Sequence, residues 1–295
     1  MTAPAATPHK AFSLARVYAI AANTLLELVR LKVFYFLLLF ALLGIGVSFF
    51  TSKMTFQEQS QVLKHAALGM MSIFTWLLAV LATAMLLPKD IEERTLYTIL
   101  AKPVPRLEYL LGKLAGVLAL LAIALAVMVA MFALVLYAQQ QSALAAVASQ
   151  LAPGPDLEAA RQQVRADTFT ANLVPGIALI YVKAAVCAAV TLLLSTFASS
   201  SIFTIIVSVM VFIIGHVQPI AREYLMITEK GASELARFFL GLVALLIPDM
   251  RAFTLLDDLA VAIPFELFMQ TAGLGVLYVA VYFLVGYLVF AGKEL

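Results

Sequence analysis

The stretch LAGVLALLAIALAVMVAMFALVLY, residues 114–137, contains no Asp, Glu, Lys, Arg or His. A helix of about 20 apolar residues crosses the hydrocarbon core of a bilayer, so this stretch predicts a transmembrane helix. The whole chain has the same character: 64% of its 295 residues are hydrophobic and 12% are charged, whereas about a quarter of the residues are charged in an ordinary soluble domain. The sequence therefore predicts an integral membrane protein.

Other apolar stretches repeat this pattern on both sides of residues 114–137. Four are clear, 33–50, 68–88, 174–198 and 270–291, and a fifth, 202–218, is short. Residues 235–247 form a run of only about 13 residues, which favours an interfacial or re-entrant helix over a crossing. We therefore expect two regions: residues 1–32 before the membrane domain, and a six-span transmembrane domain over 33–295.

The distribution of Lys and Arg predicts the orientation, because basic residues in short loops stay on the cytoplasmic side. With six spans, one side carries its basic residues in short segments: Lys10, Arg16, Arg30, Lys32, Lys89, Arg94, Lys102, Arg106, Lys113 and Lys293. We expect this side, with both termini and residues 89–113, to face the cytoplasm. The connections 138–173 and 219–269 are then extracytoplasmic, and Pro153-Gly-Pro155 divides the first of them into two short helices.

Residues 11–32 combine a polar and an apolar side at helical spacing. Arg16, Asn23, Glu27 and Arg30 fall within one arc together with His9, and Leu14, Val17, Tyr18, Ala21, Leu25 and Leu28 lie away from it. This pattern predicts an amphipathic helix lying along the membrane surface, although an ordinary solvated helix would give a similar pattern.

The stretch KDIEERTLYTILAKPVPRLEYLLGK, residues 89–113, concentrates charge between two apolar spans. Asp90 and Glu93 have the spacing of a capping box at a helix start. Pro103 ends that helix, and Pro105 suits the first turn of the next one. The sequence thus predicts a helix, a break and a returning helix. A plain solvated turn would account for the basic residues but not for four acids and two prolines.

The same stretch resembles the first cytoplasmic loop of the ABC-2 type transporter permeases. The matching residues are Glu92 or Glu93, Arg94, Thr95, Leu96, Leu100, Pro103, Arg106, Gly112 and Lys113. Arg94 stands where glycine is commoner in the family. In this departure the chain resembles the subgroup of permeases of copper-enzyme maturation and gliding-type exporters. The rest of the chain resembles the family only loosely, through its number of spans, its elbow helix and IPDMRAFTLLDDL, residues 247–259.

This resemblance implies an all-α integral membrane fold: six transmembrane helices, an N-terminal amphipathic elbow helix and a cytoplasmic coupling helix over residues 90–102. It implies an ATP-driven exporter in which the coupling helix seats in a groove of a separate ABC ATPase subunit. The residues expected to couple the permease to the ATPase are Asp90, Glu92, Glu93, Arg94, Tyr97, Thr98, Lys102 and Arg106.

The resemblance also implies that the ATPase belongs to another chain. A phosphate-binding loop needs Gly-x-x-x-x-Gly-Lys-Ser/Thr, whereas Leu114 follows Gly112-Lys113 and Glu294 follows Gly292-Lys293. ATP and Mg²⁺ would be bound by the partner, with no cofactor and no catalytic residue in this chain. The full transporter would pair two permeases, a homodimer in preference to a heterodimer, with two ATPase subunits.

Small residues mark surfaces where helices approach closely in lipid. Gly112 and Gly116 are followed at four-residue spacing by Ala122, Ala126 and Ala130, and a second group contains Ala184, Ala185, Ala188 and Ala189. These stripes indicate either packing inside the chain or a dimer seam.

Two other classes of membrane protein remain open. An ion-gradient-driven secondary transporter needs ionisable groups inside spans; Lys183 and His216 are the candidates, and both are possible contacts of a substrate or a lipid. For Lys183, snorkelling or pairing with another helix is at least as plausible, and for His216 an interfacial position is favoured. A membrane-embedded enzyme needs a cluster of reactive groups, for which Asp249, Arg251, Asp257 and Asp258 are the nearest match.

Several kinds of site are disfavoured by composition. The net charge of +2 and the scattered basic residues argue against a nucleic-acid partner. The single cysteine, Cys187, excludes an internal disulfide and a cysteine-rich metal site. The methionines in the spans are more simply packing residues than ligands of a soft metal. The N-terminus lacks the features of a signal peptide, so we expect it to be retained.

Overall fold

The computed structural model describes residues 12–53, 59–92, 104–198, 200–227, 247–254 and 264–292, together with residues 238, 241 and 243. Its elements in these ranges are helices: α1 (Leu14–Val29), α2 (Lys32–Lys53), α3 (Gln59–Ala84), α4 (Leu86–Glu92), α6 (Arg106–Gln150), α7 (Pro155–Thr168), α8 (Leu173–Phe197), α9 (Ser201–Ile227) and α11 (Phe265–Ala291). The expected all-helical fold is confirmed for this part of the chain.

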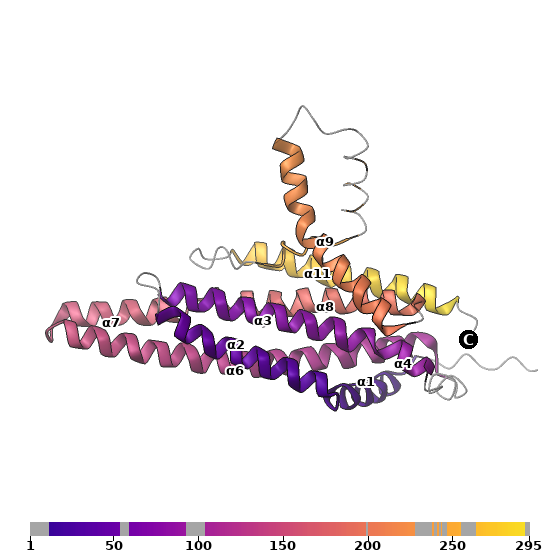
Figure 1. Cartoon of the computed structure of the whole chain (residues 1–295), viewed down its shortest axis with the longest axis horizontal. Coiled ribbons are helices and arrows are strands. Elements are labelled where there is room, and N and C mark those ends of the chain that lie inside the picture. Colours follow the sequence, from indigo (N-terminus) through magenta and orange to yellow (C-terminus); the bar gives the residue numbers. More distant parts are fainter. Residues whose placement is uncertain are drawn as a thin grey trace, which may run out of the picture.

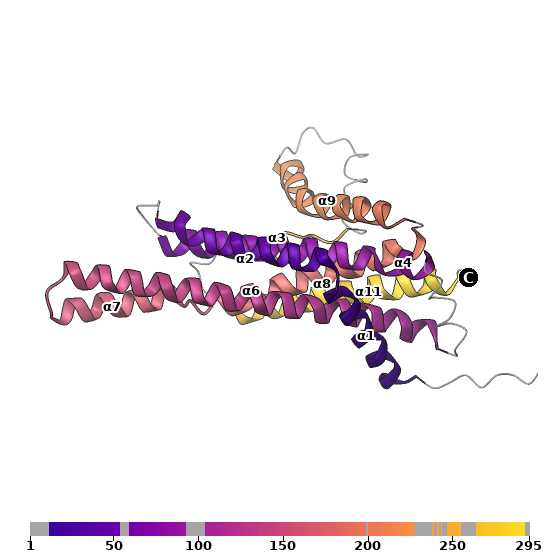
Figure 2. The ribbon, with the colours of Figure 1, turned by 60° about the horizontal axis from the view of Figure 1, so that its bottom comes forward.

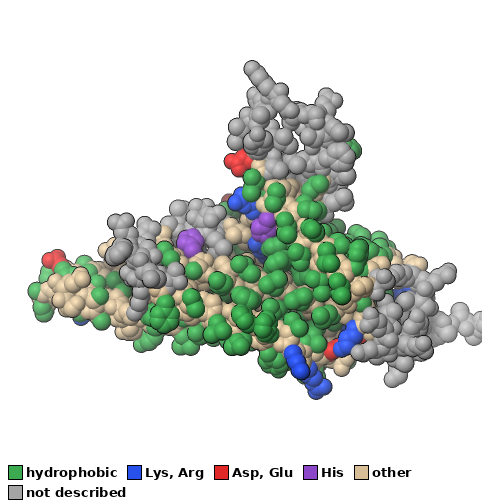
Figure 3. All heavy atoms as spheres, viewed as in Figure 1, with side chains coloured by type: hydrophobic (Ala, Val, Ile, Leu, Met, Phe, Trp, Pro, Cys, Tyr) green, Lys and Arg blue, Asp and Glu red, His purple; other side chains and the backbone are tan. Residues whose placement is uncertain are grey.

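Six of the described helices are long and apolar enough to cross a membrane, which agrees with the six predicted spans. They are α2, α3, α6, α8, α9 and α11. Most of them lie side by side along the long axis of the molecule (Figure 1). Hydrophobic side chains gather over the middle of the face seen in Figure 3, as expected of a surface that contacts lipid chains. The structure therefore agrees with the prediction of a multi-pass membrane protein.

Helix α8 occupies the centre of the bundle. It packs against α3, α6, α9 and α11. Of the most apolar 18-residue stretch of α8, 67% is buried, compared with 17% of the corresponding stretch of α11. The small side chains Ala184, Ala185, Ala188 and Ala189 are all buried. This alanine group therefore serves packing within the chain, whereas Ala122, Ala126 and Ala130 on α6 are exposed and remain candidates for a dimer seam.

Helix α1 crosses the first part of α6 at a point where two glycines remove the side chains. A Cβ atom on Gly112 would lie 2.6 Å from Ile20 Cβ, and one on Gly116 would lie 2.8 Å from the Ala21 carbonyl oxygen. Both distances are too short for a real contact. The Gly112/Gly116 stripe is therefore an internal packing surface for α1.

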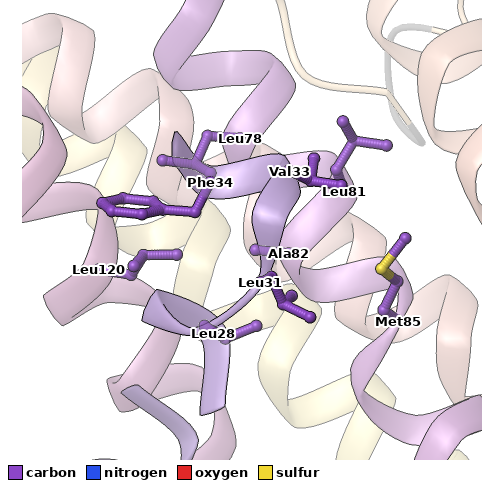
Figure 4. Close-up of a pocket in the computed structure, with 9 residues that line it drawn as sticks. All are labelled: Leu28, Leu31, Val33, Phe34, Leu78, Leu81, Ala82, Met85 and Leu120. Atoms are coloured by element: carbon purple, nitrogen blue, oxygen red, sulfur yellow. The ribbon is translucent and has the colours of Figure 1, made fainter. Parts of the chain in front are cut away.

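The turn from α1 to α2 is equally tight. Leu31 donates its amide hydrogen to the Leu28 carbonyl, and Phe34 donates to the Leu31 carbonyl. A void of about 10 Å³ lies beside the turn (Figure 4). Its lining side chains are all apolar: Leu28, Leu31, Val33, Phe34, Leu78, Leu81, Ala82, Met85 and Leu120. A void of this size holds at most one water and offers it no polar partner, so it is a packing defect and not a ligand site.

Helix α6 is much longer than the predicted span 114–137. Its 45 residues extend about 67 Å at 1.5 Å per residue, roughly twice the hydrocarbon thickness. The prediction of a separate short helix after residue 138 was wrong: residues 138–150 continue α6, because AQQQSALAAVASQ has good helix formers and no Gly or Pro. The predicted break follows at 151–154, and α7 then folds back along α6 (Figure 2).

Helix α9 continues past the predicted span 202–218 to Ile227 and contains Pro219. A proline inside a helix removes one backbone hydrogen bond and bends the helix. The second half of α9 accordingly turns away from the bundle (Figure 1). The predicted interfacial helix at 235–247 lies almost entirely outside the described residues.

The close crossing of α1 and α6 gives a stability prediction. Gly116→Ala places a methyl group against the α1 backbone, and overpacking of this kind costs about 1–3 kcal/mol. We expect a lower thermal unfolding midpoint for the purified chain in detergent. Gly176→Ala is the matched control, because no atom lies within 4 Å of its added Cβ. Equal midpoints for the two variants would contradict the crossing.

Candidate functional site

The predicted coupling residues fall into two groups. Glu93, Arg94, Tyr97, Thr98 and Lys102 lie outside the described residues, as does most of the predicted coupling helix. Glu92 ends α4, with only its backbone described, whereas Asp90 and Arg106 are described in full. The coupling helix therefore stays a prediction, but the structure places both ends of the stretch that would carry it.

Asp90 does not begin a helix as the capping-box pattern predicted. It lies inside α4, which follows α3 almost directly and begins at Leu86. The Asp90 carboxylate points to α6, where Lys113 Nζ lies 2.7 Å from Asp90 Oδ2 and the Tyr109 hydroxyl donates a hydrogen bond to the same oxygen. Asp90 is 5% exposed and Lys113 is 4% exposed. Each charge is thus balanced by the other inside the protein.

Glu27 of α1 joins this pair to α4. Its carboxylate accepts a hydrogen bond from Lys89 Nζ at 2.6 Å and lies 3.8 Å from Lys113 Nζ. Removing one member of a buried ion pair leaves the other charge uncompensated, which is far more costly than the pair itself. The four residues Glu27, Lys89, Asp90 and Lys113, here called the charged cluster, therefore connect α1, α4 and α6.

A second ionic contact fixes the other end of α1. Arg16 donates two hydrogen bonds to the Glu108 carboxylate, at 2.5 and 2.7 Å, and the Ser13 amide donates a third at 2.9 Å. The hydrogen bond with Glu108 is the main cause of a raised pKa for the Arg16 guanidinium, so the guanidinium stays protonated. Glu108 itself is fully buried.

Arg106, at the start of α6, contacts the end of α11. It donates hydrogen bonds to the carbonyl oxygens of Phe290 and Ala291, at 3.0 and 2.8 Å. The last carbonyls of a helix have no partner within the helix and carry partial negative charge, so a guanidinium stabilises them. The residues that flank 93–103 are therefore attached to α1, α6 and α11.

These contacts differ from the role that sequence reasoning gave to the same charges. Asp90 and Arg106 were expected to face an ATPase, and the structure gives both of them partners within the chain. Glu27 was assigned only to the polar side of the predicted surface helix, and Glu108 was given no role. The sequence did contain a hint of their pairing. Glu27 and Glu108 are acids within mainly apolar helical segments, and both segments lie beside predicted spans on the side that carries many basic residues.

A second polar group lies farther along the bundle and includes both of the other predicted residues. Lys183 Nζ of α8 lies 3.1 Å from His216 Nε2 of α9 and 3.0 Å from Thr254 Oγ1. His216 Nδ1 lies 3.1 Å from the Phe212 carbonyl oxygen, which can only accept. Nδ1 therefore carries a proton, and Nε2 accepts from the Lys183 ammonium. The pairing with another helix that the sequence left open for Lys183 is therefore present, and its partner is His216 of α9.

These residues border a cavity of about 640 Å³. Its lining comes from α3, α8, α9 and the segment 247–254, and comprises Gly69, Ser72, Ile73, Lys183, His216, Pro219, Arg251, Ala252 and Thr254. Ser72 precedes Asp90 by 18 residues of α3 and α4, which is roughly 25 Å along the helix axis. The cavity and the charged cluster are therefore separate sites.

The segment 247–254 brings Arg251 and Thr254 to the cavity. The Met250 amide donates to the Gly215 carbonyl at 3.1 Å, and a Cβ on Gly215 would lie 2.7 Å from the Pro248 carbonyl oxygen. Asp249 Oδ1 accepts hydrogen bonds from the amides of Arg251 and Ala252, so it shapes the turn. Of the other acids considered for an enzyme, Asp257 and Asp258 lie outside the described residues.

No group of three His, Cys, Asp or Glu residues in the described ranges could hold a metal ion. The chain matches no protein-family model and no curated protein. The interpretation of its function therefore rests on the residues themselves and on the resemblance of residues 89–113.

The Arg16–Glu108 contact predicts how α1 is held. Glu108→Gln keeps the shape of the side chain and leaves the Arg16 guanidinium without its counter-charge. We expect amide hydrogen exchange over Leu14–Val29 to be at least threefold faster than in the unmodified chain. Glu158→Gln, on the exposed α7, is the control. Unchanged exchange in the Glu108 variant would show that the glycine crossing alone holds α1.

Proposed function

We propose that the chain is the transmembrane permease subunit of an ATP-driven ABC-2 type exporter, which couples hydrolysis by a separate ATPase subunit to movement of a substrate across the bacterial inner membrane. The proposal is supported by six helices of sufficient length and apolar character and by the residue pattern of 89–113. Covalent chemistry would take place in the partner, which would bind ATP and Mg²⁺.

The observation that carries the proposal is the attachment of both flanks of residues 93–103. On one side, Asp90 and Lys89 pair with Lys113 and Glu27; on the other, Arg106 binds the end of α11. An element that transmits force from a partner must be joined firmly to the helices that it moves, because coupling passes through packed and bonded contacts. Ionic contacts to three helices provide such a joint, whereas a merely solvated turn needs none.

Within this proposal, the residues between the flanks would meet the ATPase. Asp90 and Arg106 would position the coupling element, since their charges are used inside the chain. Glu92, Glu93, Arg94, Tyr97, Thr98 and Lys102 would contact the partner. The exposed Ala122, Ala126 and Ala130 stripe would suit the seam with a second permease, a homodimer in preference to a heterodimer.

Charge reversal tests the ATPase contact. Under the proposal, Glu93→Lys with Arg94→Glu weakens binding of the ABC ATPase that co-purifies with the chain at least thirtyfold, which corresponds to about 2 kcal/mol, and buried interfacial charge pairs commonly contribute this much. Affinity is measured with the purified, membrane-inserted chain. The control is Glu158→Lys with Arg161→Glu, which reverses one exposed acid and one exposed base on α7. Unchanged binding and unchanged stimulation of ATP hydrolysis would remove the main support for the proposal.

Cysteine labelling in sealed cells tests the orientation. A membrane-impermeant maleimide should modify Ser149→Cys, at the exposed end of α6, and spare Thr98→Cys. The native Cys187 is buried, so it gives little background. A reporter fused after Leu295 should be cytoplasmic. Labelling at position 98 from outside, or an external reporter, would overturn the proposed topology.

The contact between Lys183 and His216 favours a second candidate function, an ion-gradient-driven secondary transporter. Two ionisable groups in contact inside adjacent helices are a plausible proton site. The binding measurement separates the two candidates, because a secondary transporter has no use for an ATPase partner. A chain that binds no ATPase and loses transport completely in Lys183→Met would be a secondary transporter; the proposed exporter retains part of its transport in that variant.

A further inference from the structure

The cavity of about 640 Å³ gathers three basic side chains from three different elements: Lys183 from α8, His216 from α9 and Arg251 from the segment 247–254. Lys183 is 4% exposed and lies ten residues into α8, about 15 Å along the helix. A cation at such a depth is costly unless it has a partner or a function. The cavity is therefore a concave site with cationic side chains in its lining.

The described surroundings do not neutralise this charge. The two hydrogen-bond partners of Lys183, His216 and Thr254, are neutral acceptors. Within the described ranges no carboxylate lies within ion-pair distance of Lys183 or Arg251. Asp249, the acid nearest to Arg251 in sequence, directs one oxygen to two backbone amides. A buried ammonium lacking a counter-ion is unfavourable, so an anion that enters the cavity would be stabilised.

The size and lining of the cavity define the rest of the ligand. Its volume falls within the range of sites for small organic molecules, about 300–1,000 Å³, and far exceeds the needs of one phosphate or carboxylate. Ile73, Pro219, Gly69 and Ala252 supply apolar walls. Ile73 is 51% exposed on a helix of the lipid-facing bundle, so an apolar chain can leave the cavity along this side.

We propose that this cavity binds an amphiphilic organic anion, with its phosphate or carboxylate head group held by Lys183 and Arg251 and its apolar part against Ile73 and Pro219. Lys183 supplies a point charge, and the Arg251 guanidinium offers paired donors suited to an oxyanion. His216 and Thr254 orient the Lys183 ammonium. The inference concerns a ligand site alone and does not depend on how transport is driven.

The chain carries its own reporter for this site. Trp76 is the single tryptophan, and its ring stacks on Phe212 at 3.8 Å. Phe212 in turn lies 4.3 Å from the His216 ring and 5.4 Å from Lys183 Nζ. A ligand that contacts Lys183 should therefore change the fluorescence of Trp76.

The test is a fluorescence titration of the full chain in detergent micelles, without any ATPase. Oleoyl lysophosphatidic acid is the anionic probe, and oleoyl lysophosphatidylcholine has the same acyl chain and no net charge. We expect saturable binding of the anionic probe, at least tenfold tighter than the neutral one. Lys183→Met and Arg251→Gln should each weaken it at least tenfold, and Arg161→Gln on the exposed α7 should leave it unchanged.

Three results would overturn the inference in whole or in part. Equal affinity for the two lipids would exclude recognition of charge. Unchanged affinity in Arg251→Gln would also exclude it, and this variant remains informative if Lys183→Met fails to fold, because Arg251 is exposed. Complete displacement of the anionic probe by an equal concentration of inorganic phosphate would overturn the amphiphilic part, since a free phosphate would then suffice. Because no ATPase is present, failure here is separate from failure of the proposed exporter function.

Discussion

The ion pair between Asp90 and Lys113 is the contact on which the arrangement at the α4 end of the bundle depends. Both side chains are buried, at 5% and 4% exposure, and Glu27 reaches the same ammonium from α1. Charges in an apolar interior persist only with partners and hydrogen bonds, and Tyr109 supplies one of these. The pair thereby holds α4 against α6 and, through Glu27, joins both helices to α1.

The glycine crossing and the ionic contacts support each other. Gly112 and Gly116 allow α1 to approach α6 closely, and this approach brings Arg16 and Glu27 within reach of Glu108 and Lys113. Conversely, the ion pairs hold α1 with Leu14 and Tyr18 exposed, at 74% and 76%. Arg16 and Glu27, from the polar side of α1, therefore reach partners in the bundle, whereas Asn23 and Arg30 are exposed. The apolar side is divided as well, because Leu28 is buried. An amphipathic pattern indicates that a helix has two sides, but it does not indicate which side meets the bundle.

Sequence reasoning predicted the helices well and the polar contacts poorly. The spans follow from long apolar runs, which depend only on local composition, and the described part of the chain contains six suitable helices. The extension of α6 was missed because a span prediction measures hydropathy and not helix propensity. The pairing of Lys183 with His216 was missed because the residues are 33 positions apart, and their contact depends on the packing of α8 against α9. The contact of Asp90 with Lys113 of α6 was missed for the same reason, because it depends on how α4 packs against α6. From sequence alone, a charged residue between two spans is most simply assigned to solvent or to a partner protein.

The central claim is that buried ionic contacts, and not solvation, fix the flanks of residues 93–103. A double-mutant cycle measures this most directly, with the free energy of unfolding in mixed micelles determined for Asp90→Asn, Lys113→Met and the double variant. We predict a coupling energy of at least about 1.5 kcal/mol, as found for close charge pairs in well-packed interfaces. A coupling energy below about 0.5 kcal/mol, the range of independent sites, would contradict the account.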